Sequence, residues 1–434
     1  MEKKYKVLFI QPSPYDSRGQ VIKKDRLFFA GLTFPLLAAM TPSHWEVEIC
    51  LETIEDIPFD TDADLIGIGT MGHAVHRSID ISKIFKEKGK TIVGGGYMAS
   101  LMQEEAKEFC DAVVVGDGDR AWPEVLSDFE AGKLKPSYDY PLEDYDPPLP
   151  RYELLVDKRI GDFLPVQAAR GCPHACSFCS IYCLYRRRYH KRSIESVVRD
   201  IKKIKALGFK KFLLLDDNLV ADPAYARELC EAIEKLNMRW FSQCSINLAE
   251  NPELLEALAR SGCETLSFGL ESITQSSMDS MGKKWAQVSK YEEQINAIQA
   301  AGIDVSTEMV VGADGDTLDS IRETAQFVKN NKIVIPRFYI LTPIPGTDFH
   351  DEMVAADRII NPDYSTYDSS SAVHQPKNMT ADELTKAYWD LYNEVFKVPN
   401  ILSRTIFHAR FLKYPGRHLF YLAVNLYYRY QIKR

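Results

Sequence analysis

The N-terminal third of the chain alternates short apolar runs with amphipathic stretches. The apolar runs predict strands at 6–11, 45–51, 64–70, 91–95 and 112–116. Helical spacing at 78–88 and 103–110 predicts helices between them. Unbroken apolar strands separated by helices are typical of a parallel sheet covered on both faces. We therefore expect a Rossmann-like α/β domain over residues 1–135.

A second series of strands and helices follows residues 136–163, a segment rich in Pro, Asp and Tyr that we interpret as a linker. The predicted strands of this series are 165–169, 211–216, 241–246, 265–270, 304–311 and 337–342. The predicted helices are 193–207, 224–237, 252–261, 290–301 and 318–330. Repeated βα units with right-handed crossovers predict a partial (βα)6 barrel over residues 164–347. Residues 348–434 show helices and no further strand series.

Composition narrows the class of protein. The 434 residues are 45% hydrophobic and 26% charged, which is ordinary for a soluble globular chain of two or three domains. The net charge of −8 does not provide the positive charge that usually attracts nucleic acid, so we expect no nucleic-acid partner. No apolar run reaches the length of a membrane span, and the N-terminus does not read as a signal peptide. We therefore expect a cytoplasmic, reducing location, where clustered cysteines serve as metal ligands more often than as disulfides.

Three cysteines, Cys172, Cys176 and Cys179, are spaced C-x3-C-x2-C on a loop that follows a predicted strand. Such a cluster of thiolates can hold a zinc ion or an iron–sulfur cluster. A zinc site normally uses a fourth donor, and His174 and Cys183 lie nearby in sequence. A 4Fe–4S cluster held by three thiolates instead leaves one iron open to a ligand. The position at the carboxyl end of a barrel strand favours a catalytic cluster.

The same segment resembles the radical S-adenosylmethionine (SAM) superfamily, whose signature is C-x3-C-x-aromatic-C after the first barrel strand. Phe178 occupies the aromatic position, and the resemblance covers about residues 160–345. It implies that Cys172, Cys176 and Cys179 hold a 4Fe–4S cluster, while SAM binds the open iron through its amino and carboxylate groups. One electron, from a donor such as flavodoxin or ferredoxin, would then split the sulfonium and release a 5′-deoxyadenosyl radical.

The resemblance also implies contacts to SAM at the ends of the barrel strands. The implied cofactor-binding residues are Phe178, Tyr182, Asp217, Gln243, Ser245, Glu271 and Val311. The family places an acidic residue such as Asp217 near the methionine amino group, although this position equally suits a helix N-cap. A carboxylate such as that of Glu271 is suited to ribose hydroxyls, which donate hydrogen bonds. The segment around Val311 resembles a backbone patch that stacks on adenine.

Joined to this barrel, the N-terminal sheet resembles the cobalamin (B12)-binding domain of many radical SAM enzymes. The matching residues at its strand ends are Thr70, Met71, Gly94, Gly95, Gly96, Gly116 and Asp117. Glycine loops let a broad, amide-rimmed corrin approach the backbone closely. The D-x-H-x-x-G motif that supplies a lower cobalt ligand is absent, and His73 and His76 fit the start of a helix better. This departure suggests a base-off cobalamin without a protein ligand to cobalt.

Together these features imply a cobalamin-dependent radical SAM methyltransferase that acts on an unactivated carbon of a small molecule. One alternative keeps both cofactors but ends in cyclisation, oxidation or rearrangement without net methylation. Another is a non-catalytic metal- or corrin-binding regulator, against which the near-complete barrel argues.

The C-terminal segment 401–434 contains no Asp or Glu and mixes Lys and Arg with Phe and Tyr. This composition fits either a helical lid packed on the barrel or peripheral contact with the inner face of a membrane. Membrane contact would suggest a hydrophobic or lipid-like substrate.

Overall fold

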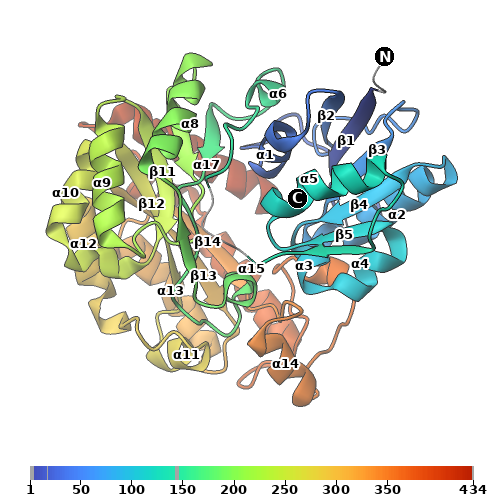
Figure 1. The fold of residues 1–434 in the computed structure, drawn as a ribbon. Coiled ribbons are helices and arrows are strands. Elements are labelled where there is room, and N and C mark those ends of the chain that lie inside the picture. Colours follow the sequence, from blue (N-terminus) through green and yellow to red (C-terminus); the bar gives the residue numbers. More distant parts are fainter. Residues whose placement is uncertain (1–3, 17, 142–145, 433–434) are drawn as a thin grey trace.

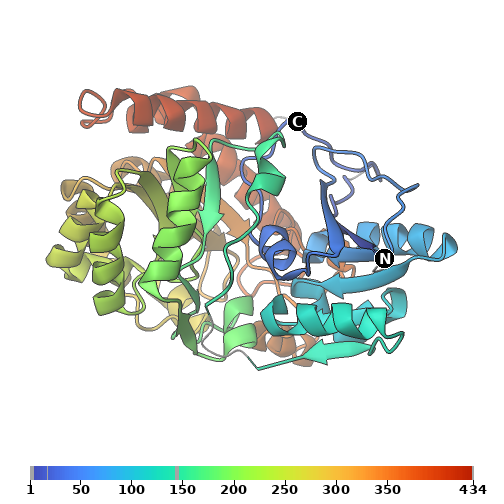
Figure 2. The ribbon, with the colours of Figure 1, turned by 45° about the horizontal axis from the view of Figure 1, so that its top comes forward.

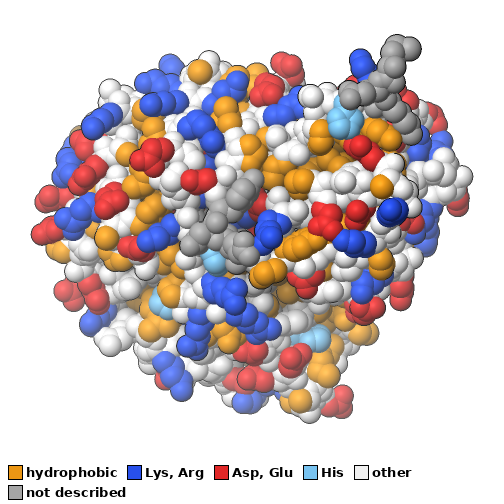
Figure 3. Space-filling model, in the orientation of Figure 1, with side chains coloured by type: hydrophobic (Ala, Val, Ile, Leu, Met, Phe, Trp, Pro, Cys, Tyr) orange, Lys and Arg blue, Asp and Glu red, His pale blue; other side chains and the backbone are white. Residues whose placement is uncertain are grey.

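The computed structural model describes residues 4–16, 18–141 and 146–432. Figures 1 and 2 show two α/β bodies side by side, with the C-terminal helices lying against the second body. On the face shown in Figure 3, acidic and basic side chains are interspersed over both bodies. Within the described part of the chain, no helix combines the length and the apolarity that a bilayer crossing requires.

The first body is a parallel sheet with strand order β2-β1-β3-β4-β5-β6. Its strands are β1 (Tyr5–Gln11), β2 (Trp45–Leu51), β3 (Leu65–Gly69), β4 (Thr91–Gly95), β5 (Ala112–Val115) and β6 (Ser137–Asp139). Its helices are α1 (Thr33–Met40), α2 (Val75–Glu87), α3 (Tyr97–Leu101), α4 (Gln103–Phe109) and α5 (Gly118–Glu130), with the 3₁₀ turn η1 (Gly72–Ala74) before α2.

Alternating residues of β1 show why helices cover both faces of this sheet. Val7 and Phe9 point into one core together with residues of α1 and α5, whereas Leu8 and Ile10 point into another with residues of α2 and α4. Because successive side chains of a strand point to opposite faces, an unbroken apolar run requires cover on both sides. The Rossmann-like prediction is confirmed.

The second body is a six-stranded parallel sheet with order β14-β13-β12-β11-β10-β7. Its strands are β7 (Phe163–Val166), β10 (Lys211–Leu214), β11 (Arg239–Cys244), β12 (Cys263–Glu271), β13 (Asp304–Val311) and β14 (Ile335–Ile340). The helices of this body are α7 (Ser180–Tyr185), α8 (Ile194–Ala206), α9 (Pro223–Glu234), α10 (Pro252–Arg260), α11 (Gln275–Ser280), α12 (Tyr291–Ala300) and α13 (Leu318–Asn330), with the 3₁₀ turns η2 (Ile246–Glu250) and η3 (Val288–Lys290). No pairing between β7 and β14 occurs among the described residues, so the barrel is partial, as predicted.

The first barrel strand is shorter than its apolar run suggests. The strand predicted at 165–169 ends at Val166, because the Ala168 amide donates to the Asp216 carboxylate at 2.8 Å instead of continuing the ladder. The chain then forms β8 (Ala169–Gly171), which pairs antiparallel with β9 (Tyr189–Lys191). This small ribbon encloses the cysteine loop.

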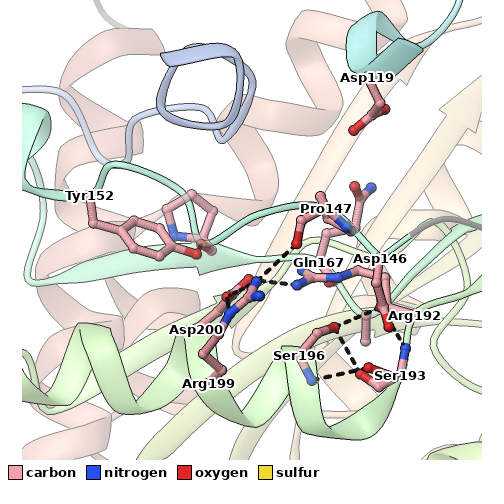
Figure 4. Close-up of polar contacts among 12 residues, drawn as sticks. Asp119, Asp146, Pro147, Tyr152, Gln167, Arg192, Ser193, Ser196, Arg199 and Asp200 are labelled. Carbon is pink, nitrogen blue, oxygen red and sulfur yellow. Dashed lines mark hydrogen bonds and ion pairs between the residues drawn. The ribbon is translucent and has the colours of Figure 1, made fainter. Parts of the chain in front are cut away.

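The segment 136–163, expected to be a linker, is structured where the structure describes it. Residues 137–139 form β6, the sixth strand of the first sheet, and α6 (Glu153–Val156) follows before the barrel. Figure 4 shows how the segment is fixed to α8. Asp146 accepts hydrogen bonds from the Ser193 amide and the Ser196 hydroxyl, both at 2.8 Å. Nearby, Arg199 donates to the Pro147 carbonyl at 3.0 Å.

The C-terminal region is helical, as predicted, and lies against the barrel. Its helices are α14 (Asp348–Ala355), α15 (Ala381–Val395), α16 (Val398–Arg404) and α17 (Pro415–Ile432), with the 3₁₀ turn η4 (Tyr364–Thr366). Helix α17 crosses the amino-terminal ends of the barrel strands (Figure 2). There the Tyr421 hydroxyl hydrogen-bonds Thr265 at 2.6 Å, and Asn425 donates to the Val334 carbonyl at 2.8 Å.

Candidate functional site

A cavity of about 1010 Å³ lies where the carboxyl edges of the two sheets face each other. From the first sheet it is lined by the glycine-rich ends of β3, β4 and β5. From the barrel it is lined by Leu215 and Asp217 after β10 and by Gln243 in β11. This volume is at the upper end of the range of small-molecule pockets, so the cavity has room for a large ligand.

The structure divides the predicted site residues between two adjacent zones. Nine of them line the cavity: Thr70, Met71, Gly94, Gly95, Gly96, Gly116, Asp117, Asp217 and Gln243. The others lie around the cysteine loop or in the barrel beyond the lining: Cys172, Cys176, Cys179, Phe178, Tyr182, Ser245, Glu271 and Val311. Asp217 joins the zones, because its carboxylate accepts the Gly171 amide at 2.7 Å.

The glycines at the first sheet's edge serve different purposes. A Cβ added at Gly95 or Gly116 would meet no atom within 4 Å, so both leave open space beside the cavity wall. Gly96 has a φ of +91° and approaches the Thr70 backbone closely, and both features require glycine. A Cβ at Gly94 would lie 2.6 Å from the Cys110 sulfur, so that glycine serves internal packing. The open cradle is therefore formed by Gly95 and Gly116, and it suits a broad ligand that rests on backbone.

Neither candidate histidine is placed to reach a ligand in the cavity. His73 lies in η1 and His76 in the first turn of α2, as expected of helix-start residues, and neither lines the cavity. His76 instead pairs with Asp363 at 2.8 Å. The cradle therefore fits a corrin that receives no histidine from this loop.

The cysteine loop runs from β8 to the start of α7. Gly171 opens it with a φ of +85°, and an added Cβ there would clash with the Arg188 carbonyl. Cys179 is the N-cap residue of α7, where the Ile181 and Tyr182 amides favour its ionised form. Burial nevertheless raises the pKa of Cys179 to about 11, and the charge of Cys172 contributes to the rise. Burial raises the pKa of Cys176 to about 12, although Lys283 opposes the shift.

Cys172 and Cys179 both contribute to the raised pKa of Cys176, so the three thiols lie close enough to influence one another. Because thiolates rather than thiols bind metals, these buried groups are suited to a metal that ionises them on binding.

The arrangement favours an iron–sulfur cluster over a single metal ion. Among the described residues, no three His, Cys, Asp or Glu side chains converge closely enough to hold one ion. The fourth donors that zinc would need are engaged elsewhere. His174 stacks on Trp285 with 4.0 Å between ring centroids, and the Cys183 thiol donates to the Gly346 carbonyl at 3.0 Å. Each thiolate of a cubane binds a different iron, so wider spacing is what such a cluster needs.

A buried lysine that the sequence did not single out lies beside this loop. Lys283 donates to the Glu271 carboxylate at 2.7 Å and to the Gly269 carbonyl, and its charge acts on Cys176 and Cys179. Glu271 is held in the left-handed region, with a φ of +57°. Lys283 precedes the exposed Lys284, and such a pair of lysines resembles an ordinary solvated face. Only the fold reveals that the first of them is buried.

Four other predicted contacts have local partners. The Tyr182 ring lies under the Arg186 guanidinium, and Phe178 packs on the main core. Ser245 hydrogen-bonds the Asn218 side-chain oxygen, while the Asn218 amide group donates to the Cys172 sulfur at 3.8 Å. Val311 is buried at the end of β13, and its carbonyl accepts the Leu341 amide. Of these four, Ser245 has the direct structural link to the cysteine loop, through Asn218.

Arg170, two residues before the first cysteine of the motif, ties the two bodies together. Its guanidinium pairs with both carboxylate oxygens of Asp119 and lies 3.2 Å from Asp117. The Tyr185 hydroxyl donates to Asp117 from the barrel side at 3.2 Å. Burial raises the pKa of Asp117, and the nearby Arg170 counteracts that rise. The glycine–acid loop after β5 is thus bonded directly to the chain that enters the cysteine loop.

Comparison with known proteins gives three similarities. Residues 166–328 match the family model described as the radical SAM superfamily. The bacteriochlorophyllide d C-8(2)-methyltransferase of Chlorobaculum tepidum is 30% identical over 398 residues, which cover 86% of this chain and 87% of the relative. The bacteriochlorophyllide d C-12(1)-methyltransferase of the same organism is 29% identical over 410 residues, covering 92% and 89%.

Among solved structures, the chain is similar to the radical SAM methyltransferase TsrM from Kitasatospora setae, determined with cobalamin and a 4Fe–4S cluster bound. The TM-score is 0.65 at 17% identity, over 82% of this chain and 75% of that one. At this identity the match establishes a shared fold, in which a parallel α/β sheet precedes a partial barrel.

Proposed function

This chain belongs to the radical SAM superfamily, and from that membership we propose that it is a cobalamin-dependent methyltransferase that acts on an unactivated carbon. Membership brings a 4Fe–4S cluster and SAM, and Cys172, Cys176 and Cys179 are the residues that would hold the cluster. Gly95 and Gly116 would receive the corrin. The observation that carries the proposal is the single cavity that joins these glycines to the barrel edge.

When bound, the cluster and SAM supply a 5′-deoxyadenosyl radical, and cobalamin supplies a methyl group. The residues of this chain perform positioning. The Arg170–Asp119 ion pair fixes the first sheet's loop against the cysteine loop, and Lys283 places a positive charge beside the thiolates. Positioning of this kind is the main contribution a protein makes to cofactor chemistry.

The substrate class follows from the cavity wall and from the relatives. Phe29, Phe34 and Leu37 line the cavity, so an apolar ring system would be held away from water there. Both named relatives carry bacteriochlorophyllide d in their names. We therefore propose a hydrophobic small molecule as substrate and a small electron-transfer protein such as flavodoxin or ferredoxin as the electron donor.

The test uses protein purified without oxygen in the presence of cobalamin, and begins with an iron count and an absorbance spectrum. Incubation with methyl-labelled SAM, a reductant and bacteriochlorophyllide d as the first probe should transfer label to the product. Two SAM molecules should be consumed in each turnover, one giving 5′-deoxyadenosine and one giving the methyl group.

Two results would contradict the proposal. Formation of 5′-deoxyadenosine with an altered but unmethylated product would indicate a cyclase, oxidase or rearranging enzyme. Full function in a cell after Cys172→Ala would indicate a non-catalytic regulator.

A further inference from the structure

Several polar side chains of the C-terminal segment 401–434 point toward the interior of the protein. Arg404 is buried and donates to Asn425 and to the Val395 carbonyl. Arg410 and Arg417 both pair with the buried Asp304, at 3.0 and 3.2 Å. These contacts hold α17 and the loop before it on the amino-terminal ends of the barrel strands. Of the cations that the structure describes in this segment, Arg404, Arg410, Arg417 and Arg429 are engaged internally.

The outward side of the same segment is apolar. On α17 the exposed positions Leu419, Ala423, Leu426, Tyr427 and Tyr430 follow the spacing of one helical face. The preceding loop adds Phe407, which is 73% exposed, and Leu412, which is 90% exposed. A surface helix of a globular protein normally has the reverse arrangement, with its apolar stripe facing the core. We call these seven residues the outer apolar face.

The segment that carries this face has cationic side chains and no acidic ones. No Asp or Glu occurs after Glu394, and Lys413 is exposed next to Leu412, whereas Lys397 pairs with Glu394 at 2.6 Å. The face shown in Figure 3 differs, because acids and bases are mixed over it. Apolar and aromatic side chains beside an exposed lysine, on a segment without acidic side chains, have the composition of a surface that rests on anionic lipid headgroups.

Aromatic rings run from α17 toward the cavity. Phe420, on the side of α17 toward the first body, stacks with Phe28 at 6.4 Å between centroids. Phe28 is 54% exposed and contacts Phe29, and Phe29 lines the cavity. An apolar molecule that leaves a bilayer at α17 would therefore meet a continuous run of rings leading to the cavity.

We propose that the outer apolar face docks on an anionic lipid bilayer, and that Phe420, Phe28 and Phe29 form the route by which a hydrophobic substrate enters the cavity. The entry route rests on the proposed function, whereas the docking does not. A second copy of the chain fits the outer apolar face less well than an anionic bilayer does. A two-fold dimer would bring Lys413 of each copy against the same acid-free segment of the other.

Flotation with vesicles tests the docking. Full-length protein is mixed with vesicles of phosphatidylcholine, with or without phosphatidylglycerol, and the bound fraction is measured. We expect binding that requires phosphatidylglycerol and weakens with salt. The combined variant Leu412→Ser, Leu419→Ser and Leu426→Ser should lower the bound fraction about tenfold. The control Val354→Ser with Ile360→Ser removes residues that are 56% and 50% exposed elsewhere, and it should bind as the unaltered chain does.

Two outcomes would overturn the docking: no binding of the unaltered chain to either vesicle, or equal binding of the serine variant and the control. Size-exclusion chromatography runs in parallel. If the serine substitutions turn a dimer into a monomer without changing vesicle binding, the face is a contact between copies. None of these readouts needs cofactors or turnover, so they remain valid if the proposed function fails.

The variant Phe28→Ala tests the entry route. It should float with vesicles as the unaltered chain does, because Phe28 is outside the outer apolar face. Transfer of bacteriochlorophyllide d from vesicles into the protein, followed by quenching of tryptophan fluorescence, should slow several-fold. An unchanged transfer rate would overturn the route.

Discussion

The two parallel sheets of this protein present different chemistry at the same topological position. At the carboxyl edge of the first sheet, Gly95 and Gly116 leave open space and offer backbone to a ligand. At the carboxyl edge of the barrel, three cysteines, Asp217 and the Lys283–Glu271 pair offer side chains. Both edges lie beyond the ends of parallel strands, where ligands bind in open α/β sheets.

The difference shows how residue choice at strand ends selects the ligand. An edge of glycines suits a large molecule with few charges, since affinity comes from contact area and backbone hydrogen bonds. An edge of buried thiols and paired charges suits a metal cluster and a zwitterionic molecule. The following three substitutions test this contrast in order of expected effect.

The largest effect is expected from Cys176→Ser in the side-chain edge. It removes one of three cluster ligands, so bound iron should fall at least about tenfold and methyl transfer should reach background. Iron content and the cluster absorbance measure the loss. The matched control is Cys183→Ser, in α7 just beyond the motif, where the thiol donates to the Gly346 and Cys179 carbonyls, which a serine hydroxyl can also do. Equal loss of iron in the control would show that the three-cysteine assignment is wrong.

The second effect is expected from Gly95→Leu in the backbone edge. A leucine side chain would fill the open space of the cradle, so cobalamin affinity should fall at least about tenfold while iron content stays unchanged. Titration with cobalamin, followed by absorbance, measures this change. Gly72→Leu is the control, because Gly72 also has open space around it but lies outside the cavity. Unchanged cobalamin binding in a folded Gly95→Leu protein would contradict the cradle.

The smallest effect is expected from Asp216→Asn, which concerns stability. Burial raises the pKa of Asp216 from 3.8 to about 7, so ionising this group costs stability as pH rises through that window. This loss of stability is absent below pH 3.8, the pKa of Asp216 in the unfolded chain, and it is complete above about pH 7, its pKa in the folded protein. Between pH 5 and pH 8 the melting temperature of the asparagine variant should therefore fall less than that of the unaltered chain. The difference between the two falls should be a few degrees at most.

Thermal unfolding at several pH values measures this difference in slope. The control is Asp56→Asn, whose side chain is 99% exposed. Identical slopes for the Asp216→Asn variant and the unaltered chain would show that Asp216 is not ionised at a cost in the native state.

The sequence was sufficient for the architecture and for the cysteine motif, and insufficient for contacts between distant residues. Strand runs such as residues 91–95 are apolar enough to be recognised locally, and the Cys172–Cys179 spacing is local too. Strand β6 was missed because three residues with one buried tyrosine carry no periodic signal. Lys283 was missed because a lysine pair resembles a solvated face and only the fold shows that it is buried against Glu271. The Arg170–Asp119 pair was missed because its partners lie far apart in the chain.

The Arg170–Asp119 pair has a consequence for selectivity. Because it joins the loop after β5 to the chain that enters the cysteine loop, it helps to set the distance between a ligand in the cradle and a ligand at the cysteine loop. This distance then selects which atom of a bound molecule is modified. On the proposed function, a relative that shifted this bridge by a residue would methylate a different carbon of the same ring.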